Sequence, residues 1–412
     1  MKRLVLLTVL MLSATTARAA TCQGTPPEVG ANYNQWLADV DPGLLHKSGV
    51  KWLRAFVNIE RNFLTFNKAG RITGVLESNI SQPTDSVSSD SENLGSYSIS
   101  HFVNSKSVLV NGQPIKLILS LKFDFKYQNA GVPNPKSKEM AYLLSAVEQF
   151  LKKDNLGGQI DILVVGNEPM FETPVQDAQK FGAFLNLLIE DVDSLKSENP
   201  GWNYRIFAGA LNKASSMPDD PILQQVIAIT NGNPRVAGLD LHEHVASLPE
   251  QLADLEFVRT TEKVTKQLIS TEFSMVGLWD AHSSDLLGAW GAQHGFGSKT
   301  PLFQWIDDLV QLAAMGNAID QNEFLSYFEI QPWYPAGWFA TMFEQFKCQN
   351  TYAVTYGIQT PISVPPILYD KTSMLWYVNF VFNCTLFGMG SDGYCNTNPL
   401  VFSDFENAVH GM

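Results

Sequence analysis

Short apolar runs alternate with longer amphipathic stretches along most of this chain. Valine, isoleucine and leucine dominate the short runs, and polar or turn-forming residues bound them. Runs of this kind predict buried β-strands. We expect eight strands, at residues 29–33, 50–58, 115–121, 160–166, 204–210, 236–242, 267–272 and 324–330.

Helical periodicity fills several of the intervals between these strands. Strands that alternate with helices predict repeated βα units around a parallel sheet. Eight of them favour an α/β fold, a (β/α)8 TIM barrel with long βα loops. An open doubly wound sheet is the alternative, but no glycine-rich phosphate turn follows the first strand. The helices are expected at residues 137–153, 175–197, 248–265, 301–315 and 373–382.

The first residues have the pattern of a secretory signal peptide. Lys2 and Arg3 precede an apolar stretch, and Ala17-Arg18-Ala19 is typical of a cleavage site. We therefore expect residues 1–19 to be a signal peptide and the protein to be secreted, either extracellular or periplasmic. No later stretch is long and apolar enough to cross a bilayer.

Residues 20–412 are expected to form a single barrel domain, because insertions take such barrels to about 400 residues. A segment rich in serine, aspartate and asparagine, at about residues 77–105, predicts a loop insertion after the second strand. Loops in this position help to build the active face of a barrel.

The net charge of the chain limits the classes of partner that it can bind. Asp and Glu number 41 against 28 Lys and Arg, which gives a net charge of −13. Removing Lys2, Arg3 and Arg18 with the signal peptide takes three positive charges away and leaves −16. This charge disfavours nucleic acid and anionic membranes as partners. We expect a monomer, since nothing in the sequence argues strongly against one.

Four cysteines fit two disulfides in an oxidising compartment, and the sequence leaves three pairings open. We favour Cys384 with Cys395 and Cys22 with Cys348. Their spacings match no zinc ribbon or thioredoxin-type motif.

Two glutamates end predicted strands. Glu168 follows the fourth strand in Val164-Val165-Gly166-Asn167-Glu168-Pro169, and Glu272 ends the seventh in Ile269-Ser270-Thr271-Glu272-Phe273. A carboxylate beside a buried strand is costly unless it is paired or used by a site. The pair therefore predicts acid/base and nucleophilic chemistry.

The Asn167-Glu168-Pro169 tripeptide, its partner Glu272 and their strand positions resemble the retaining glycoside hydrolases of clan A, such as families 5 and 39. The resemblance implies that Glu168 is the acid/base, that Glu272 is the nucleophile and that Asn167 bonds the sugar 2-hydroxyl. It implies no metal and no organic cofactor. Retention requires the two carboxyl groups to lie about 5 to 5.5 Å apart. Glu168 would also need a raised pKa, while Glu272 must stay ionised.

The same resemblance points to four supporting residues. Arg54 on the second strand would pair with the nucleophile. His242 matches the histidine of a His-x-Tyr motif on the sixth strand, and His244 stands where the tyrosine would be. Trp333, after the predicted eighth strand, would form a platform under the sugar. Trp279 and Trp290 are either outer subsites or core residues, and Glu172 is expected to be solvated.

Two other classes of function compete with this interpretation. His242 and His244 share one face of a strand, which is also a metal-ligand pattern of barrel amidohydrolases. A carbohydrate-binding barrel without turnover is the other alternative. We favour a secreted retaining glycoside hydrolase that cleaves a β-linked polysaccharide or oligosaccharide by double displacement. Long loops favour endo action, although they are also compatible with an exo-acting pocket.

Overall fold

The computed structural model describes residues 23–76, 99–362, 366 and 368–411. Within these residues eight parallel strands close into a barrel in the order β1-β12-β11-β10-β9-β8-β7-β2. The predicted (β/α)8 barrel is confirmed. The strands are β1 (Glu28–Asn32), β2 (Trp52–Asn58), β7 (Lys116–Lys122), β8 (Ile162–Val165), β9 (Arg205–Asn212), β10 (Val236–His244), β11 (Gln267–Ser274) and β12 (Thr351–Gly357).

The predicted eighth strand is wrong. Residues 324–330 belong mostly to a helix, α13 (Gln321–Glu329), and the true eighth strand is β12. Phe324, Tyr327 and Phe328 are buried at helical spacing, and the Asp320 side chain caps the helix by accepting two backbone N–H bonds. The run of apolar residues in this segment is therefore the buried face of a helix.

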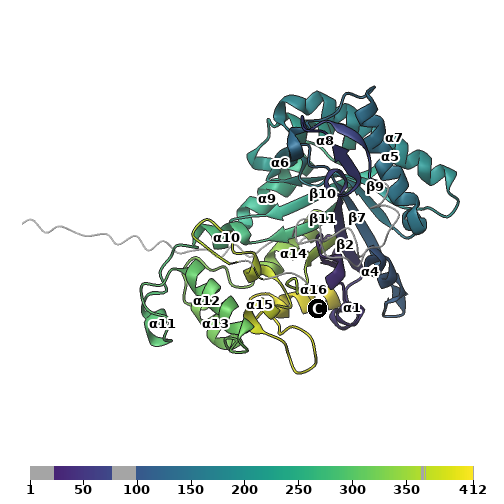
Figure 1. Ribbon diagram of the computed structural model, residues 1–412. Helices are drawn as coiled ribbons and strands as arrows, with labels where there is room; N and C mark the ends of the chain where they lie inside the picture. Colours follow the sequence, from purple (N-terminus) through teal and green to yellow (C-terminus); the bar gives the residue numbers. More distant parts are fainter. Residues whose placement is uncertain (1–22, 77–98, 363–365, 367, 412) are drawn as a thin grey trace, which may run out of the picture.

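Helices surround the barrel, and further helices gather in a lobe beside it (Figure 1). The helices expected at 137–153, 175–197 and 301–315 are present as α5 (Lys138–Lys152), α7 (Ala178–Glu198) and α12 (Leu302–Ala314), and α9 (Leu248–Glu256) occupies the first part of 248–265. The helix expected at 373–382 is wrong, since only a 3-10 turn, Trp376–Asn379, forms there. The helices around the barrel are α1 (Pro42–Ser48), α2 (Ile59–Phe63), α4 (Ile99–Asn104), α5 (Lys138–Lys152), α6 (Pro169–Glu172), α7 (Ala178–Glu198), α8 (Pro221–Gly232), α9 (Leu248–Glu256), α14 (Trp338–Cys348) and α16 (Phe402–His410).

The lobe forms where the chain leaves the barrel between β11 and β12. Its helices are α10 (Val276–Ala281), α11 (Gly288–Gln293), α12 (Leu302–Ala314) and α13, with α15 (Cys384–Phe387) from the later part of the chain beside them (Figure 1). Two small hairpins complete the structure, β3 (Leu64–Phe66) with β4 (Ile72–Val75), and β5 (Leu109–Val110) with β6 (Gln113–Pro114).

Several sequence predictions concern the ends and the insertion. The predicted signal peptide and residues 77–98 lie outside the described residues, and residues 99–105 form α4 and the start of a 3-10 turn, where a loop was expected. Cys384 and Cys395 form the predicted disulfide. The other predicted bond involves Cys22, which is outside the described residues. Among the described residues, no helix is long and apolar enough to span a membrane.

Apolar side chains fill the part of the barrel interior that lies away from the carboxyl ends of the strands. Polar side chains lie near those ends. This filling determines where a site can form, because a packed barrel has no pore and its open face is the one built by the βα loops. The interior cluster comprises Trp52, Ile118, Ile162, Val164, Phe207, Ile269 and Ala353.

Candidate active site

Strands that are distant in the sequence bring the predicted site residues together. Asn167 and Glu168 follow β8, His242 and His244 lie at the end of β10, and Glu272 lies near the end of β11. In a parallel barrel these strand ends share one face, so their side chains can meet.

The backbone at the end of β8 sets the position of Glu168. Gly166 has φ +137, and a Cβ there would lie 1.9 Å from the carbonyl oxygen of Gly209, so only glycine fits. Glu168 itself is left-handed, with φ 45, and its N–H donates to the carbonyl of Ala210 at 3.0 Å. A non-glycine residue in this region costs on the order of 1 kcal/mol or more. Pro169 then begins α6.

Arg54 is the central donor of the site. Its side chain is fully buried and forms the predicted ion pair with Glu272. A buried arginine requires an anionic partner and many acceptors, and this one has both. Its guanidinium donates to Ser120 Oγ at 3.2 Å, Asn32 Oδ1 at 3.2 Å, Asn34 Oδ1 at 3.1 Å, Asn167 Oδ1 at 2.8 Å and Glu272 Oε1.

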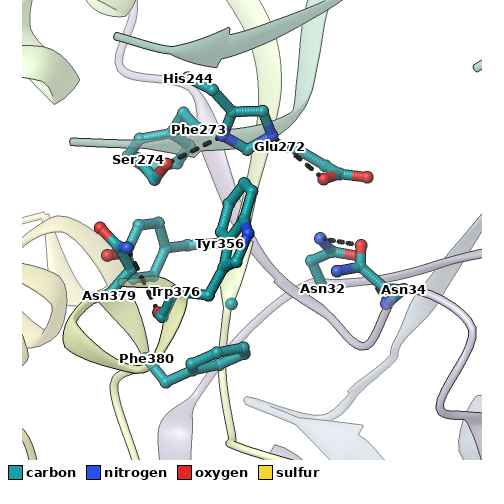
Figure 2. A pocket seen from close by; sticks show the side chains of 11 residues that line it. Asn32, Asn34, His244, Glu272, Phe273, Ser274, Tyr356, Trp376, Asn379 and Phe380 are labelled. Atoms are coloured by element: carbon teal, nitrogen blue, oxygen red, sulfur yellow. Dashed lines mark hydrogen bonds and ion pairs between the residues drawn. The ribbon is translucent and has the colours of Figure 1, made fainter. Parts of the chain in front are cut away.

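Positive groups hold Glu272 ionised. Burial would raise its pKa, but the charges of His242 and Arg54 and the contacts with His244 bring the pKa well below the ordinary value. His244 Nε2 lies 3.2 Å from Glu272 Oε2, and His244 Nδ1 lies 2.9 Å from Ser274 Oγ (Figure 2). His244 therefore contacts Glu272 from the position of the tyrosine in the His-x-Tyr motif.

Glu168 differs from the sequence expectation. Asn212 Nδ2 donates to Glu168 Oε1 at 2.7 Å, and His242 Nδ1 lies 3.2 Å from the same oxygen. Burial acts to raise the pKa of Glu168, but the hydrogen bond and charge of His242, with the charge of His244, outweigh it and lower the pKa to about 2. The pKa of Glu168 is therefore lowered where the sequence called for a raised one, because the sequence did not reveal the contact with His242.

One imidazole ring lies between the two glutamates. His242 Nδ1 approaches Glu168, while its Nε2 lies 3.7 Å from Glu272 Oε1 and 3.2 Å from Thr271 Oγ1. Burial opposes the charged form of His242, but the charge of Glu272 and the bond to Glu168 raise its pKa. Both glutamates are partly exposed, with 25% of the Glu168 side chain and 13% of the Glu272 side chain accessible.

A small cavity lies beside Glu272 (Figure 2). Its volume is about 30 Å³, enough for one or two water molecules. Trp376, from the segment after β12, lines it and meets His244 edge-on at 5.1 Å between ring centroids. The other lining residues include Asn32, Asn34, Ser274, Asn379 and Phe380.

Trp333 is not placed as the sequence predicted. It follows α13 in the lobe, and its ring stacks on His282 at 4.1 Å, with Trp279 and Phe328 as further neighbours. Its described contacts include neither glutamate. The error follows from the misassigned eighth strand, and Trp376, which does follow the true eighth strand, is the tryptophan beside Glu272. Trp279 and Trp290 are buried in the aromatic core of the lobe.

Glu172 is buried, although the sequence suggested a solvated residue. Lys122 Nζ lies 2.8 Å from its Oε1, and Asn167 Nδ2 lies 3.5 Å from the same atom. Burial raises the pKa of Glu172 to about 8 despite the nearby lysine. Glu172 is therefore a buried partner of Lys122 that lies next to Asn167.

Sequence reasoning missed several residues that contact the site. Asn32 and Asn212 are the last residues of β1 and β9, so the strand-end rule that identified the glutamates could have identified them too. Trp376 carried no comparable signal, since it lies in an irregular segment. The remaining missed residues are Asn34, Ser120, Asp240 and Thr271.

The two histidines and Glu168 could also hold a metal ion. Their ligand atoms lie within 4.8 Å of one another. Each histidine nitrogen, however, already contacts a side-chain oxygen, from Glu168, Glu272, Thr271 or Ser274. A metal would have to replace these contacts next to the charge of Arg54.

No family model matches this sequence, and neither does any curated protein. Among solved structures, the chain is similar to a variant of the GH5_18 protein of Bifidobacterium longum in complex with Manβ1-4GlcNAc, with 11% identity, a TM-score of 0.47 and coverage of 93% of this chain and 78% of the other. It is also similar to a thermostable mutant of a xylanase from Cellvibrio japonicus, with 11% identity, a TM-score of 0.44 and coverage of 94% and 99%. An endo-β1,6-glucanase gives 10% identity, a TM-score of 0.43 and coverage of 94% and 77%. Values this low bear on neither activity nor substrate, and the assignment of the barrel rests on its own strand pairing.

Proposed function

We propose that this chain is a retaining glycoside hydrolase in which Glu272 is the nucleophile and Glu168 is the acid/base. The observation that carries the proposal is the contact of both glutamates with one imidazole ring, that of His242, at 3.2 and 3.7 Å. Retaining enzymes need carboxyl groups about 5 to 5.5 Å apart, whereas inverting enzymes leave room for a water molecule at about 6.5 to 9.5 Å. The choice of a retaining mechanism is supported by the ion pair of Arg54 with Glu272, which keeps Glu272 ionised as a nucleophile must be.

The first step would form a bond between Glu272 and the anomeric carbon. The glycosidic C–O bond breaks at the same time, and the leaving oxygen takes a proton from Glu168. In the second step Glu168 accepts a proton from water, and the water oxygen displaces Glu272. The low pKa of Glu272 suits a nucleophile, because the carboxylate stays ionised across the range in which glycans are stable.

Asn167 has an amide group that suits the sugar 2-hydroxyl. Its Oδ1 accepts from Arg54 at 2.8 Å, which fixes the amide, and its Nδ2 makes only a long contact of 3.5 Å with Glu172. A contact of that length is weak, so a hydrogen on Nδ2 is available to donate to a hydroxyl group. Such a bond strengthens in the transition state.

The proposed substrate is a β-linked polysaccharide or oligosaccharide, and the proposed setting is outside the cytoplasm. The Cys384–Cys395 disulfide suits an oxidising compartment. The net charge of −13 suits a neutral or basic glycan better than an acidic polymer. We also propose that the protein acts within glycan chains, is a monomer and has no nucleic acid or membrane partner.

The test of this proposal is product release from a panel of β-glucans, mannans, xylans, galactans and exopolysaccharides. Wild-type protein should release product from at least one of them, and Glu272→Gln should release almost none. Glu329→Gln is a matched control, since Glu329 is exposed at the end of α13 in the lobe. Proton NMR early in the reaction would show the configuration at the anomeric carbon of the product. Retention of that configuration would support double displacement. Inversion would contradict it.

A metal-dependent hydrolase is the second candidate, because the ligand atoms of Glu168, His242 and His244 lie within 4.8 Å. The two candidates differ in their response to chelation. Dialysis against EDTA should leave a retaining glycosidase fully active, whereas a metal enzyme would lose turnover and regain it with added Zn²⁺. Binding to the panel without turnover, unchanged in Glu272→Gln, would instead indicate a non-catalytic barrel.

A further inference from the structure

We propose that Asp240 and Thr271 are positioning residues that fix a hydrogen on Nε2 of His242, so that a single proton is shared between Nδ1 of His242 and Glu168. This inference rests on the proposed role of Glu168 as the acid/base. It addresses how Glu168 obtains the proton that an acid must give.

Asp240 is fully buried and accepts two hydrogen bonds from Thr271. The backbone N–H of Thr271 donates to Asp240 Oδ1 at 3.0 Å, and the Thr271 hydroxyl lies 2.6 Å from Asp240 Oδ2. A carboxylate only accepts hydrogen bonds, so the hydroxyl must give its hydrogen to Asp240. Burial raises the pKa of Asp240 to about 6, so Asp240 is mostly ionised at neutral pH and above.

The orientation of the Thr271 hydroxyl determines the tautomer of His242. Thr271 Oγ1 has no second hydrogen, and it lies 3.2 Å from His242 Nε2. It can therefore only accept from that nitrogen, which places a hydrogen on Nε2.

Nδ1 of His242 then shares one proton with Glu168 across 3.2 Å. Either His242 carries the proton and Glu168 is ionised, or His242 is neutral and Glu168 is protonated. The total charge is the same in both arrangements. The low pKa of Glu168 and the raised pKa of His242 favour the first in the free protein. A bound glycan that displaces water around Glu168 would favour the second, since burial disfavours charge.

The proton count closes over the reaction. Glu168 gives the shared proton to the leaving oxygen, which leaves Glu168 ionised and His242 neutral with its hydrogen on Nε2. Water then supplies a proton to Glu168 as its oxygen attacks the intermediate, and the shared proton is restored.

A bulge in the sheet makes this arrangement possible. Leu241 pairs with Ser270 and His242 pairs with Glu272, so Thr271 is the extra residue between them. Bulges of this kind re-aim side chains, and here two consecutive residues of β11 both reach His242. Asp240 and His242 are two residues apart on β10, which puts them on one face of the strand.

Four charged or titratable groups besides Asp240 surround the His242 ring. Glu168 after β8 and Glu272 on β11 act on it from other strands, Arg54 on β2 pairs with Glu272, and His244 follows on its own strand with ring centroids 5.8 Å apart. None of these groups bonds Thr271 Oγ1 in the described structure, so Asp240 alone sets the direction of that hydroxyl.

Asp240→Asn should reverse the chain of hydrogen bonds. The asparagine oxygen would keep the bond from the Thr271 backbone, and its amide nitrogen would then donate to Thr271 Oγ1. The Thr271 hydroxyl would be free to donate to His242 Nε2, so neutral His242 would carry its hydrogen on Nδ1. Glu168 would then face a fixed donor and stay ionised. A wrong tautomer after an Asp to Asn change is known from serine proteases.

The first test needs no substrate. Protein with ¹⁵N-labelled histidine would be studied by long-range proton–nitrogen NMR at rising pH until the shared proton is lost, because an imidazolium carries hydrogens on both nitrogens and only the neutral ring reports the tautomer. The His242 signals would be assigned from His242→Gln. The wild type should show a hydrogen on Nε2, and Asp240→Asn should lose it. Thr271→Ser keeps a hydroxyl and should match the wild type. Asp254→Asn is the matched control, since Asp254 is another buried aspartate that accepts a backbone N–H, from Ser215.

A hydrogen on Nδ1 alone in the wild type, or an unchanged Nε2–H signal in folded Asp240→Asn, would overturn the inference. Both outcomes are independent of whether the protein cleaves glycans. Should Asp240→Asn fail to fold, Thr271→Val gives a second route. It removes the acceptor of the Nε2–H and should also shift the Nε2 signal away from that of the wild type.

The second test uses turnover. Asp240→Asn should slow hydrolysis of the glycan that the wild type cleaves by about 10²- to 10⁴-fold, which is the usual contribution of a general acid. It should hardly change the hydrolysis of the 2,4-dinitrophenyl glycoside of the same sugar, whose leaving group needs no proton. An equal loss on both substrates would mean a merely structural role for Asp240 and would overturn the inference, while leaving the proposed function intact.

Discussion

The ring of His242 lies between Glu168 and Glu272, with Nδ1 3.2 Å from one carboxylate and Nε2 3.7 Å from the other. This relationship links the protonation of the two residues, because any change on the ring acts on both. The apparent pKa values of Glu168, His242 and Glu272 therefore describe the three residues together and not a single glutamate.

The activity should have a bell-shaped dependence on pH. Glu272 must be ionised, and its pKa is held well below the ordinary value, so the acid limb should lie below about pH 4.3. The shared proton must be present, and the raised pKa of His242 keeps it until the pH rises above about 6.5. Measurement of kcat/KM against pH checks this. An alkaline limb near about pH 4.3, as for an ordinary glutamic acid, would contradict the role of His242.

Arg54→Met should damage both stability and activity. It leaves Glu272 buried beside fewer positive charges, and the loss of one partner of a buried pair costs about 3 to 5 kcal/mol. The pKa of Glu272 should rise, so the acid limb of the pH profile should move to higher pH. Urea denaturation and the pH profile of any remaining activity measure the two effects. Arg71→Met serves as the control, because Arg71 is exposed. A stability equal to that of the control would contradict the central role of Arg54.

Glu172→Gln should change how stability depends on pH. The folded pKa of Glu172 is about 8, above the unfolded value of about 4.3, so the folded state favours its protonated form. Its contribution is present at low pH and is lost as the pH rises from the unfolded to the folded value. The glutamine variant cannot ionise and should gain stability relative to the wild type between about pH 5 and pH 9. Thermal unfolding at both pH values would show this, and a constant difference between the two proteins would speak against it.

Trp376 and Trp333 should respond differently to substitution. Trp376 lines the cavity beside Glu272, so Trp376→Ala should raise KM on the cleaved glycan by about tenfold, the loss of one aromatic contact. Trp333 packs on His282 in the lobe, so Trp333→Ala should mainly lower the melting temperature. Kinetics and thermal unfolding of both variants separate the two roles. The reverse pattern would restore the platform role that the sequence suggested for Trp333.

The sequence predicted those parts of the site that local rules control. Glu168, Glu272 and Arg54 were identifiable because a charged residue in or beside a buried strand needs a partner, and the structure joins them around His242 and Asn167. The barrel followed from the alternation of strands and helices. Seven of the eight barrel strands in the structure overlap a predicted strand, as their bounds show.

The remaining features depend on tertiary structure. The segment between β11 and β12 contains the helix α13, which has an apolar face. Its apolar residues resemble a strand unless their helical spacing is recognised. The low pKa of Glu168 depends on a contact with a histidine that is 74 residues away in the sequence. The roles of Asp240 and Thr271 depend on a bulge in the pairing of β10 with β11, and no sequence pattern marks its position.

Covalent labelling of the nucleophile would identify the carboxylate that attacks the sugar. The protein would be incubated with activated 2-deoxy-2-fluoro β-glycosides of glucose, mannose, xylose and galactose, digested and analysed by mass spectrometry. We expect one of these sugars to become attached to Glu272, and Glu272→Gln to remain unlabelled. A sugar attached to a different carboxylate, or turnover of a glycan that persists in Glu272→Gln, would contradict the role of Glu272 as the nucleophile.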